Sequence, residues 1–378
     1  MIFRKSKENG QPGLISWLPI FFVLAWGTVK ADSVRGVWVV RHDMATPASV
    51  ATVVETAKNA GMNTLFVQVR GRGDAYYRSD LVPLAEDVES GFDPLAACLK
   101  LANRQGINVH AWINVYLTWY PDRPAPPEHV LHSHPEWFMI SNDGVDMGQL
   151  QDGMDLKSRG VEGRYMSPSN PEVQRYLLSV IKELVSRYQV KGIHLDYVRY
   201  PNEHYDYSPL AQAGFWTDAA LEPPKSESED KTRAVWNRWR SAQVTSFVHR
   251  VKQVVQKTRK GTLLSAAVKP DRGMAYTRYG QNWLHWVNRN YLDFAIPMFY
   301  TGSTQSIRAR MDDVRKYVQR GQVLAGIGAW NQKTADTLDQ IDASLKARLS
   351  GFCLFSYTTL AESSDLQELL VRRFGESK

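Results

Sequence analysis

The sequence has few of the residues that stabilise small disulfide-rich domains or that form compact metal sites. Only two of its 378 residues are cysteines, Cys98 in a predicted helix and Cys353 in a predicted strand, and no His-Glu-x-x-His motif occurs. We interpret the pair as two buried free thiols, and the alternative is a disulfide, which an oxidising compartment would allow. The residue types and their spacing therefore predict neither a resident metal nor a cofactor.

A long apolar run is also missing. The stretch Leu14–Trp26 is shorter than the roughly 20 residues that span a bilayer. Basic residues precede it, and Val29-Lys30-Ala31 follows it with small residues where a signal peptidase cleaves. We therefore expect residues 1–31 to be a cleavable signal peptide and residues 32–378 to be one mature domain. No cysteine lies near the expected cleavage site, so we expect a periplasmic or secreted protein without a lipid anchor or stable membrane insertion.

The charge bias is mild. The net charge is +7, and removing a signal peptide with four basic residues and one acidic residue leaves about +4. These charges are scattered, so we expect no nucleic-acid partner. The 12 Trp and 17 Tyr are consistent both with a large core and with aromatic faces that stack on sugar rings.

From Val34 onward, strand-like and helix-like segments alternate without a second domain or a repeat. The apolar runs predict eight strands, at residues 34–40, 64–70, 108–114, within 191–201, and at 263–269, 293–300, 323–328 and 351–357. A helix follows each strand, and long loops follow the third and fourth strands. This alternation predicts an α/β protein, a (β/α)8 TIM barrel with parallel strands.

In such barrels the site lies at the carboxyl ends of the strands. The two-residue period of a strand directs one set of polar side chains inward, namely Gln68, Arg70, His110, Trp112, Asn114, His194 and Asp196. Tyr197, Arg199 and Tyr200 follow Asp196 directly. Tyr300 and Trp330 stand at the ends of later strands. A polar ring of this kind is costly to bury without partners or a ligand.

Few carboxylates stand at this end of the predicted barrel. Asp196 is the leading candidate for a catalytic group. Asp43 follows the first predicted strand. Glycosidic cleavage uses one carboxylate to stabilise an oxocarbenium-like centre and a second carboxylic acid to protonate the leaving oxygen. Asp196 fits the first role. The candidates for the acid are Asp74, Glu136, Glu203 and Asp271.

Several motifs resemble the bacterial glycosyl-hydrolase-like family ten. They occur in order along the mature chain, at residues 67–79, 110–114, 134–138, 168–173, 192–201 and 292–300. The resemblance implies a secreted or envelope-associated barrel that acts on glycans. The better-understood members cut peptidoglycan strands stripped of peptides. By the same resemblance, Asp196 is the expected catalytic carboxylate, and the expected site residues are Arg70, Asp74, Trp112, Asn114, Arg199 and Tyr300.

The sequence departs from relatives in one respect that bears on mechanism. Strand five ends in Ala267-Val268-Lys269-Pro270-Asp271, without the Glu that many retaining barrel glycosidases place there. Two alternatives to a glycoside hydrolase therefore stay open. One is a glycan-binding barrel without a productive carboxylate pair. The other is a metal-dependent deacetylase that uses His42, Asp43, His110, His194 and Asp196.

Overall fold

The computed structural model of the chain describes residues 33–150, 152–224 and 230–375. The predicted signal peptide lies outside them. One sheet of parallel strands forms the centre, in the spatial order β10-β11-β1-β2-β3-β6-β7-β8-β9. Its strands are β1 (Val34–Val39), β2 (Thr64–Arg70), β3 (Asn108–Asn114), β6 (Gly192–Asp196), β7 (Leu263–Val268), β8 (Phe294–Pro297), β9 (Gln322–Val323), β10 (Ala325–Gly328) and β11 (Gly351–Phe355).

The strands β9 and β10 together form the seventh strand of the barrel. Strand β9 pairs with β8 and β10 pairs with β11, so the two pieces join the ends of the sheet. Leu324 lies between them, and its amide donates to the carbonyl of Ala295 at 3.0 Å. The amide of Phe299 likewise donates to the carbonyl of Gly326 at 2.8 Å. The prediction of an eight-stranded parallel barrel is confirmed, with this one strand interrupted and the barrel nearly closed.

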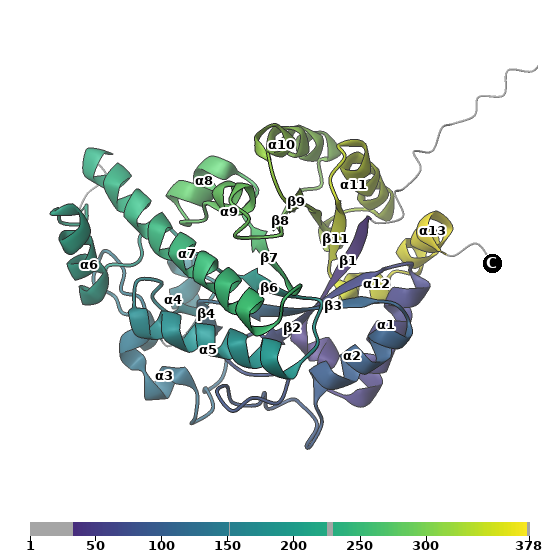
Figure 1. Cartoon of the computed structure of the whole chain (residues 1–378), viewed down its shortest axis with the longest axis horizontal. Helices are drawn as coiled ribbons and strands as arrows, with labels where there is room; N and C mark the ends of the chain where they lie inside the picture. Colours follow the sequence, from purple (N-terminus) through teal and green to yellow (C-terminus); the bar gives the residue numbers. More distant parts are fainter. Residues whose placement is uncertain (1–32, 151, 225–229, 376–378) are drawn as a thin grey trace, which may run out of the picture. The chain divides into compact units, whose positions relative to one another are not determined.

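Helices surround the strands (Figure 1). They begin at conventional caps, as at Thr46, Asp93 and Asn170, where a side chain accepts a backbone N–H and a proline follows. The main helices are α1 (Pro47–Asn59), α2 (Pro94–Arg104), α5 (Pro171–Arg187), α7 (Asp230–Thr258), α9 (Trp283–Asn288), α10 (Thr304–Tyr317), α11 (Thr334–Lys346), α12 (Tyr357–Glu362) and α13 (Ser364–Phe374). None of the helices in the described residues is both long enough and apolar enough to cross a membrane.

The inside of the barrel is filled by aromatic side chains. The rings of Phe66, His110, His194 and Phe294 pack against one another, with ring centroids 4.8 to 6.2 Å apart in the contacting pairs. Both cysteines are buried free thiols, as predicted. The barrel interior is therefore a packed core, so any ligand must bind at the carboxyl ends of the strands.

The loops after the third and fourth barrel strands carry additional elements. After β3 the chain forms β4 (Leu117–Trp119), α3 (Val130–Ser133), α4 (Gly153–Ser158) and β5 (Arg164–Tyr165). Strands β4 and β5 pair antiparallel, which returns the far end of this loop to the end of β3. After β6 the loop contains α6 (Pro209–Ala219). The sequence predicted these loops but not their internal structure.

Candidate functional site

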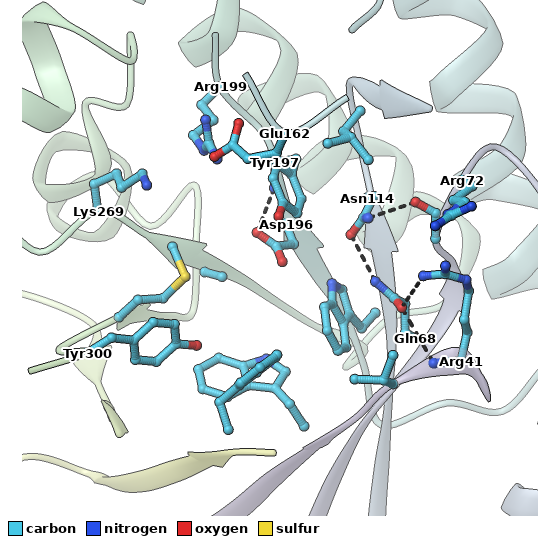
Figure 2. Close-up of a pocket in the computed structure, with 18 of the residues that line it drawn as sticks. Arg41, Gln68, Arg72, Asn114, Glu162, Asp196, Tyr197, Arg199, Lys269 and Tyr300 are labelled. Atoms are coloured by element: carbon cyan, nitrogen blue, oxygen red, sulfur yellow. Dashed lines mark hydrogen bonds and ion pairs between the residues drawn. The ribbon is translucent and has the colours of Figure 1, made fainter. Parts of the chain in front are cut away.

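A pocket of about 600 Å³ lies at the carboxyl end of the barrel strands. This volume is within the range of small-molecule and cofactor sites in proteins. Residues at the ends of β1, β2, β3, β6, β7, β8 and β11 contribute to its lining, together with the loop that contains β4 and β5. Figure 2 shows the polar side chains that point into it.

The structure brings six of the predicted site residues together in this pocket. Its lining includes Trp112, Asn114, Asp196, Tyr197, Arg199 and Tyr300. Trp330 stands at the rim, where its ring contacts those of Tyr300 and Phe355 edge to face at 4.8 and 5.4 Å. Trp330 is 49% exposed, so part of this indole is free to meet a ligand.

Four other predicted residues are buried and do not line the pocket. Arg70 is fully buried and donates to the backbone carbonyl of Asn114, because the register of β2 shifts between Gln68 and Arg70. Asp74 accepts the amide of Arg72 at 2.9 Å within the loop after β2. These side chains hold the strand ends in place rather than face a ligand.

His194 and Tyr200 are the other two buried residues. His194 lies within the barrel and accepts a hydrogen bond from the indole of Trp38 at 3.0 Å, with its other nitrogen 2.9 Å from Ser265. Burial lowers the pKa of His194 well below its usual value, so the imidazole is neutral. Tyr200 is fully buried, with the guanidinium of Arg240 over its ring at 4.2 Å.

The remaining acidic candidates lie outside the pocket lining. Glu136 is exposed and contacts His134 at 3.1 Å, and Glu203 pairs with Arg278 at 2.7 Å. Asp271 caps α8 (Arg272–Thr277) by accepting the amide of Met274. The structure therefore gives each of the three a local partner away from Asp196.

Asp196 ends β6 and is almost completely buried. One of its oxygens accepts the amide of Tyr197 at 2.7 Å. Burial raises the pKa of Asp196 to about 6, while the Tyr197 amide and the positive charges of Arg199 and Lys269 limit the increase. At neutral or slightly acidic pH this carboxyl group can therefore hold or release a proton.

Glu162 is the second carboxylate of the pocket, and sequence reasoning missed it. It accepts hydrogen bonds from Arg199 at 2.7 Å and from the Tyr165 hydroxyl at 2.8 Å. Burial opposes its ionisation, but Arg199 and these hydrogen bonds outweigh that effect and lower the pKa of Glu162. Its negative charge in turn contributes to the raised pKa of Asp196. The pocket thus holds two interacting carboxyl groups whose pKa values are shifted in opposite directions.

A hydrogen-bonded row of side chains forms the wall beside β1, β2 and β3. The amide of Asn114 donates to the carbonyl of Gly71 at 2.7 Å, and Gln68 donates to the Asn114 oxygen at 3.3 Å. Gln68 in turn accepts from the guanidinium of Arg41 at 3.3 Å. This row fixes the amide groups of Gln68 and Asn114 in the pocket (Figure 2).

The residues weighed for a metal site are dispersed. His42 contacts Asp87 at 3.0 Å and Asp43 accepts from Thr358 at 3.2 Å, whereas His110 and His194 belong to the barrel interior. The sequence also has one His-x-His pair, His132 and His134, which lies in the long third loop. Within residues 33–150, 152–224 and 230–375, no three His, Cys, Asp or Glu side chains are grouped so that they could hold a metal ion.

Solved structures with similar architecture include a glycoside hydrolase domain and a beta-amylase catalytic domain. The glycoside hydrolase domain of PgaB (BpsB) from Bordetella bronchiseptica superposes with a TM-score of 0.69 at 14% identity, covering 92% of this chain and 99% of that domain. The catalytic domain of a Paenibacillus polymyxa beta-amylase gives 0.62 at 12% identity, with coverages of 92% and 98%. At such low identity these similarities establish the barrel fold alone.

Several sequence relatives carry glycosyl hydrolase names. The chain is 24% identical over 354 residues to glycosyl hydrolase DigH of Escherichia coli K12, covering 82% of this chain and 70% of the relative. It is 20% identical over 275 residues to glycosyl hydrolase YngK of Bacillus subtilis 168, covering 66% and 48%. The family described as glycosyl hydrolase-like 10 matches residues 33–330. With that match over most of its length, the chain belongs to the glycosyl hydrolase-like 10 family.

Proposed function

We propose that this protein is a glycoside hydrolase of the bacterial cell envelope that cleaves peptide-free glycan strands of peptidoglycan, or a related polysaccharide. The observation that carries the proposal is the pair of interacting carboxyl groups, Asp196 and Glu162, in one pocket at the end of the barrel. Oppositely shifted pKa values are typical of an acid and its ionised partner in glycosidases.

The two carboxyl groups divide the chemistry between them. Asp196, with its pKa raised to about 6, is the proton donor to the leaving glycosidic oxygen. Glu162 stays ionised and stabilises the oxocarbenium-like centre, either directly or by activating a water. From the sequence we expected Asp196 to stabilise the oxocarbenium-like centre. Its burial favours the neutral acid form instead, so we assign it the role of proton donor.

The remaining pocket residues bind and orient the sugar. Gln68 and Asn114 present fixed amide groups for sugar hydroxyls. Tyr300 and Trp330 present aromatic rings at the pocket and its rim. The family resemblance in the strand motifs supports peptidoglycan as the source of the glycan. The predicted signal peptide supports a periplasmic or secreted location.

Incubation with purified peptide-free glycan strands tests this proposal. New reducing ends should form, and proton NMR of the first products should give one anomer, which reports retention or inversion. Strands that still carry peptides serve as the comparison substrate. Binding of the strands without any release of reducing ends would instead support the non-catalytic glycan-binding barrel.

The acid role of Asp196 predicts a pH dependence. Because Asp196 must be protonated, kcat/KM should fall about tenfold per pH unit above a pH near 6. Glu162, whose pKa is lowered, stays ionised through this range and limits activity only in stronger acid. The measurement is kcat/KM between pH 4 and pH 8. A flat profile from pH 5 to pH 8 would exclude Asp196 as the acid.

Trp330 offers a test of sugar stacking at the rim. Trp330→Ala should weaken binding of a glycan oligomer by about two- to twelvefold, because a stacked aromatic ring contributes about 0.5–1.5 kcal/mol. Stability should change little, since the indole is 49% exposed. Trp216→Ala is the matched control, because Trp216 is 59% exposed on α6, whereas Trp330 packs against Tyr300 and Phe355 of the pocket lining. Equal affinities of the two variants would remove Trp330 from the binding surface.

A further inference from the structure

The pocket contains more positive than negative side chains. Its lining includes five cationic residues, Arg41, Arg72, Arg199, Lys269 and Arg310, but only two carboxyl groups, Asp196 and Glu162. Two of the cations are already neutralised. Arg72 forms two hydrogen bonds with Asp122, at 2.7 and 3.0 Å, and Arg199 pairs with Glu162.

The other three cations have no carboxylate partner among the described residues. Lys269 is half-buried at the end of β7, with its ammonium group 4.8 Å from the centre of the Tyr279 ring. Burial, followed by the repulsion of Arg199, lowers the pKa of Lys269. Arg310 reaches the pocket from α10 and is exposed. Glu162 and Asp196 attract the Lys269 ammonium group, but neither forms an ion pair with it among the described residues. A partly desolvated cation without a paired carboxylate gains from an incoming anion.

Arg41 is held in the pocket by its surroundings. It is only 8% exposed, its guanidinium contacts the Gln68 oxygen, and its Nε has no hydrogen-bond partner in the described part of the chain. Gly71 makes room for it, because a Cβ at position 71 would lie 2.6 Å from Arg41 Cδ. Local packing thus positions the guanidinium and leaves hydrogen-bonding capacity unused.

The unpartnered cations lie on both sides of the catalytic carboxyl group. Lys269 directly follows β7, which neighbours the Asp196 strand β6 on one side. Arg41 follows β1, which is reached from β6 in the other direction through β3 and β2. Figure 2 shows the same arrangement, with Lys269 on one side of Asp196 and Arg41 on the other.

We infer that Lys269 and Arg41 bind carboxylates of acidic sugars on the two sides of the cleaved bond, so the pocket selects a polyanionic glycan. This inference rests on the proposed function and specifies its substrate further. In a peptidoglycan strand every second sugar bears a lactyl carboxylate, which is free only once the peptide has been removed. Either linkage of such an alternating strand joins an acidic sugar to a neutral one, and the next acidic sugar follows the neutral one. Acidic sugars therefore lie on both sides of the cleaved bond. Neutral chitin-like strands and cationic glucosamine polymers lack this charge pattern.

The test compares three oligosaccharides of equal length. They are peptide-free glycan, the same glycan with its lactyl carboxylates reduced to alcohols, and a neutral chitin oligomer. Binding is measured by calorimetry with the Asp196→Asn protein, so that no substrate is consumed. Native strands should bind at least roughly tenfold more tightly than reduced strands, because hydrogen bonds to charged groups are stronger than neutral ones. The difference should shrink at high salt.

Substitution of Lys269 identifies the group responsible. Lys269→Gln in the same background should weaken binding of native strands about tenfold while leaving reduced strands unaffected. Lys100→Gln, at an exposed position on α2, is the control. Thermal unfolding of each variant checks that the fold is kept.

The outcomes separate this inference from the proposed function. Equal affinity for native and reduced strands, or an equal loss for both in Lys269→Gln, would overturn the inference even if the wild-type protein cleaves peptidoglycan. Selective binding of native strands by a wild-type protein that cleaves none of them would support the inference and overturn the proposed function.

Discussion

Replacing Asp196 with Asn is expected to lower turnover of peptide-free glycan strands by about 10²–10⁴-fold, the range that a general acid contributes. The substitution keeps an oxygen that can accept the amide hydrogen of Tyr197, so the strand end should keep its geometry. Asp339→Asn, at an exposed position on α11, is the matched control and should retain wild-type turnover. Turnover within threefold of wild type in Asp196→Asn would place the acid elsewhere.

The same variant should be more stable than the wild-type protein at neutral pH. The pKa of Asp196 is about 6 in the folded chain against 3.8 for the unperturbed group, so folding takes up a proton between these values. The free energy of unfolding therefore falls as pH rises through this window, and the loss is complete above pH 6. Asn does not ionise, so Asp196→Asn should gain on the order of 3 kcal/mol at pH 7.5. Urea unfolding at pH 4 and pH 7.5 measures the difference in the free energy of unfolding between the variant and the wild type. This difference should nearly vanish at pH 4.

Replacing Glu162 with Gln is the second prediction with a large effect. Loss of the ionised carboxylate should lower kcat by about 10²–10⁴-fold, because the oxocarbenium-like centre loses its counter-charge. It should also shift the basic limb of the pH profile to lower pH, since the charge of Glu162 helps to raise the pKa of Asp196. Glu203→Gln is the control, because Glu203 pairs with Arg278 outside the pocket lining.

A further experiment separates a catalytic from a positioning role for Glu162. In Glu162→Ala, formate or azide can occupy the vacated space beside the sugar. Partial recovery of turnover with these anions indicates that the carboxylate acts on the reacting centre. Lack of recovery, together with normal glycan binding, would indicate that Glu162 acts by holding Arg199, with which it pairs at 2.7 Å.

The sequence predicted the barrel because its signals are local. Apolar strands, capped helices and their alternation are each readable within about ten residues. The two-residue period also predicted correctly that Trp112, Asn114 and Asp196 share the inner face at the mouth. Arg70 follows the same period but not the same environment. The register shift after Gln68 directs the Arg70 guanidinium to a backbone carbonyl at the end of β3. No pattern in the sequence indicates this shift.

Glu162 could not be found by the same reasoning. Its place depends on the pairing of β4 with β5 across a long Pro-rich loop, which no short-range pattern encodes. Lys269 belongs to the strand end that lacks the Glu of many retaining barrel glycosidases, but its lack of an ion-pair partner among the described residues is a property of the folded pocket. Residues on strands with regular register were thus predictable, whereas residues positioned by a register shift, by loop pairing or by charge balance were not.

The packed barrel interior determines how the active site would regain its proton. The imidazole of His194 is neutral, and both of its nitrogens are engaged by Trp38 and Ser265. His110, deeper in the barrel, has its pKa lowered to about 3, chiefly by burial. These imidazoles therefore cannot relay a proton from the barrel interior to Asp196. The carboxyl group must be reprotonated by solvent that enters at the mouth of the barrel. A glycan bound in the mouth would also close that route, so the leaving part of the cleaved strand would have to depart before water can enter and return a proton to Asp196.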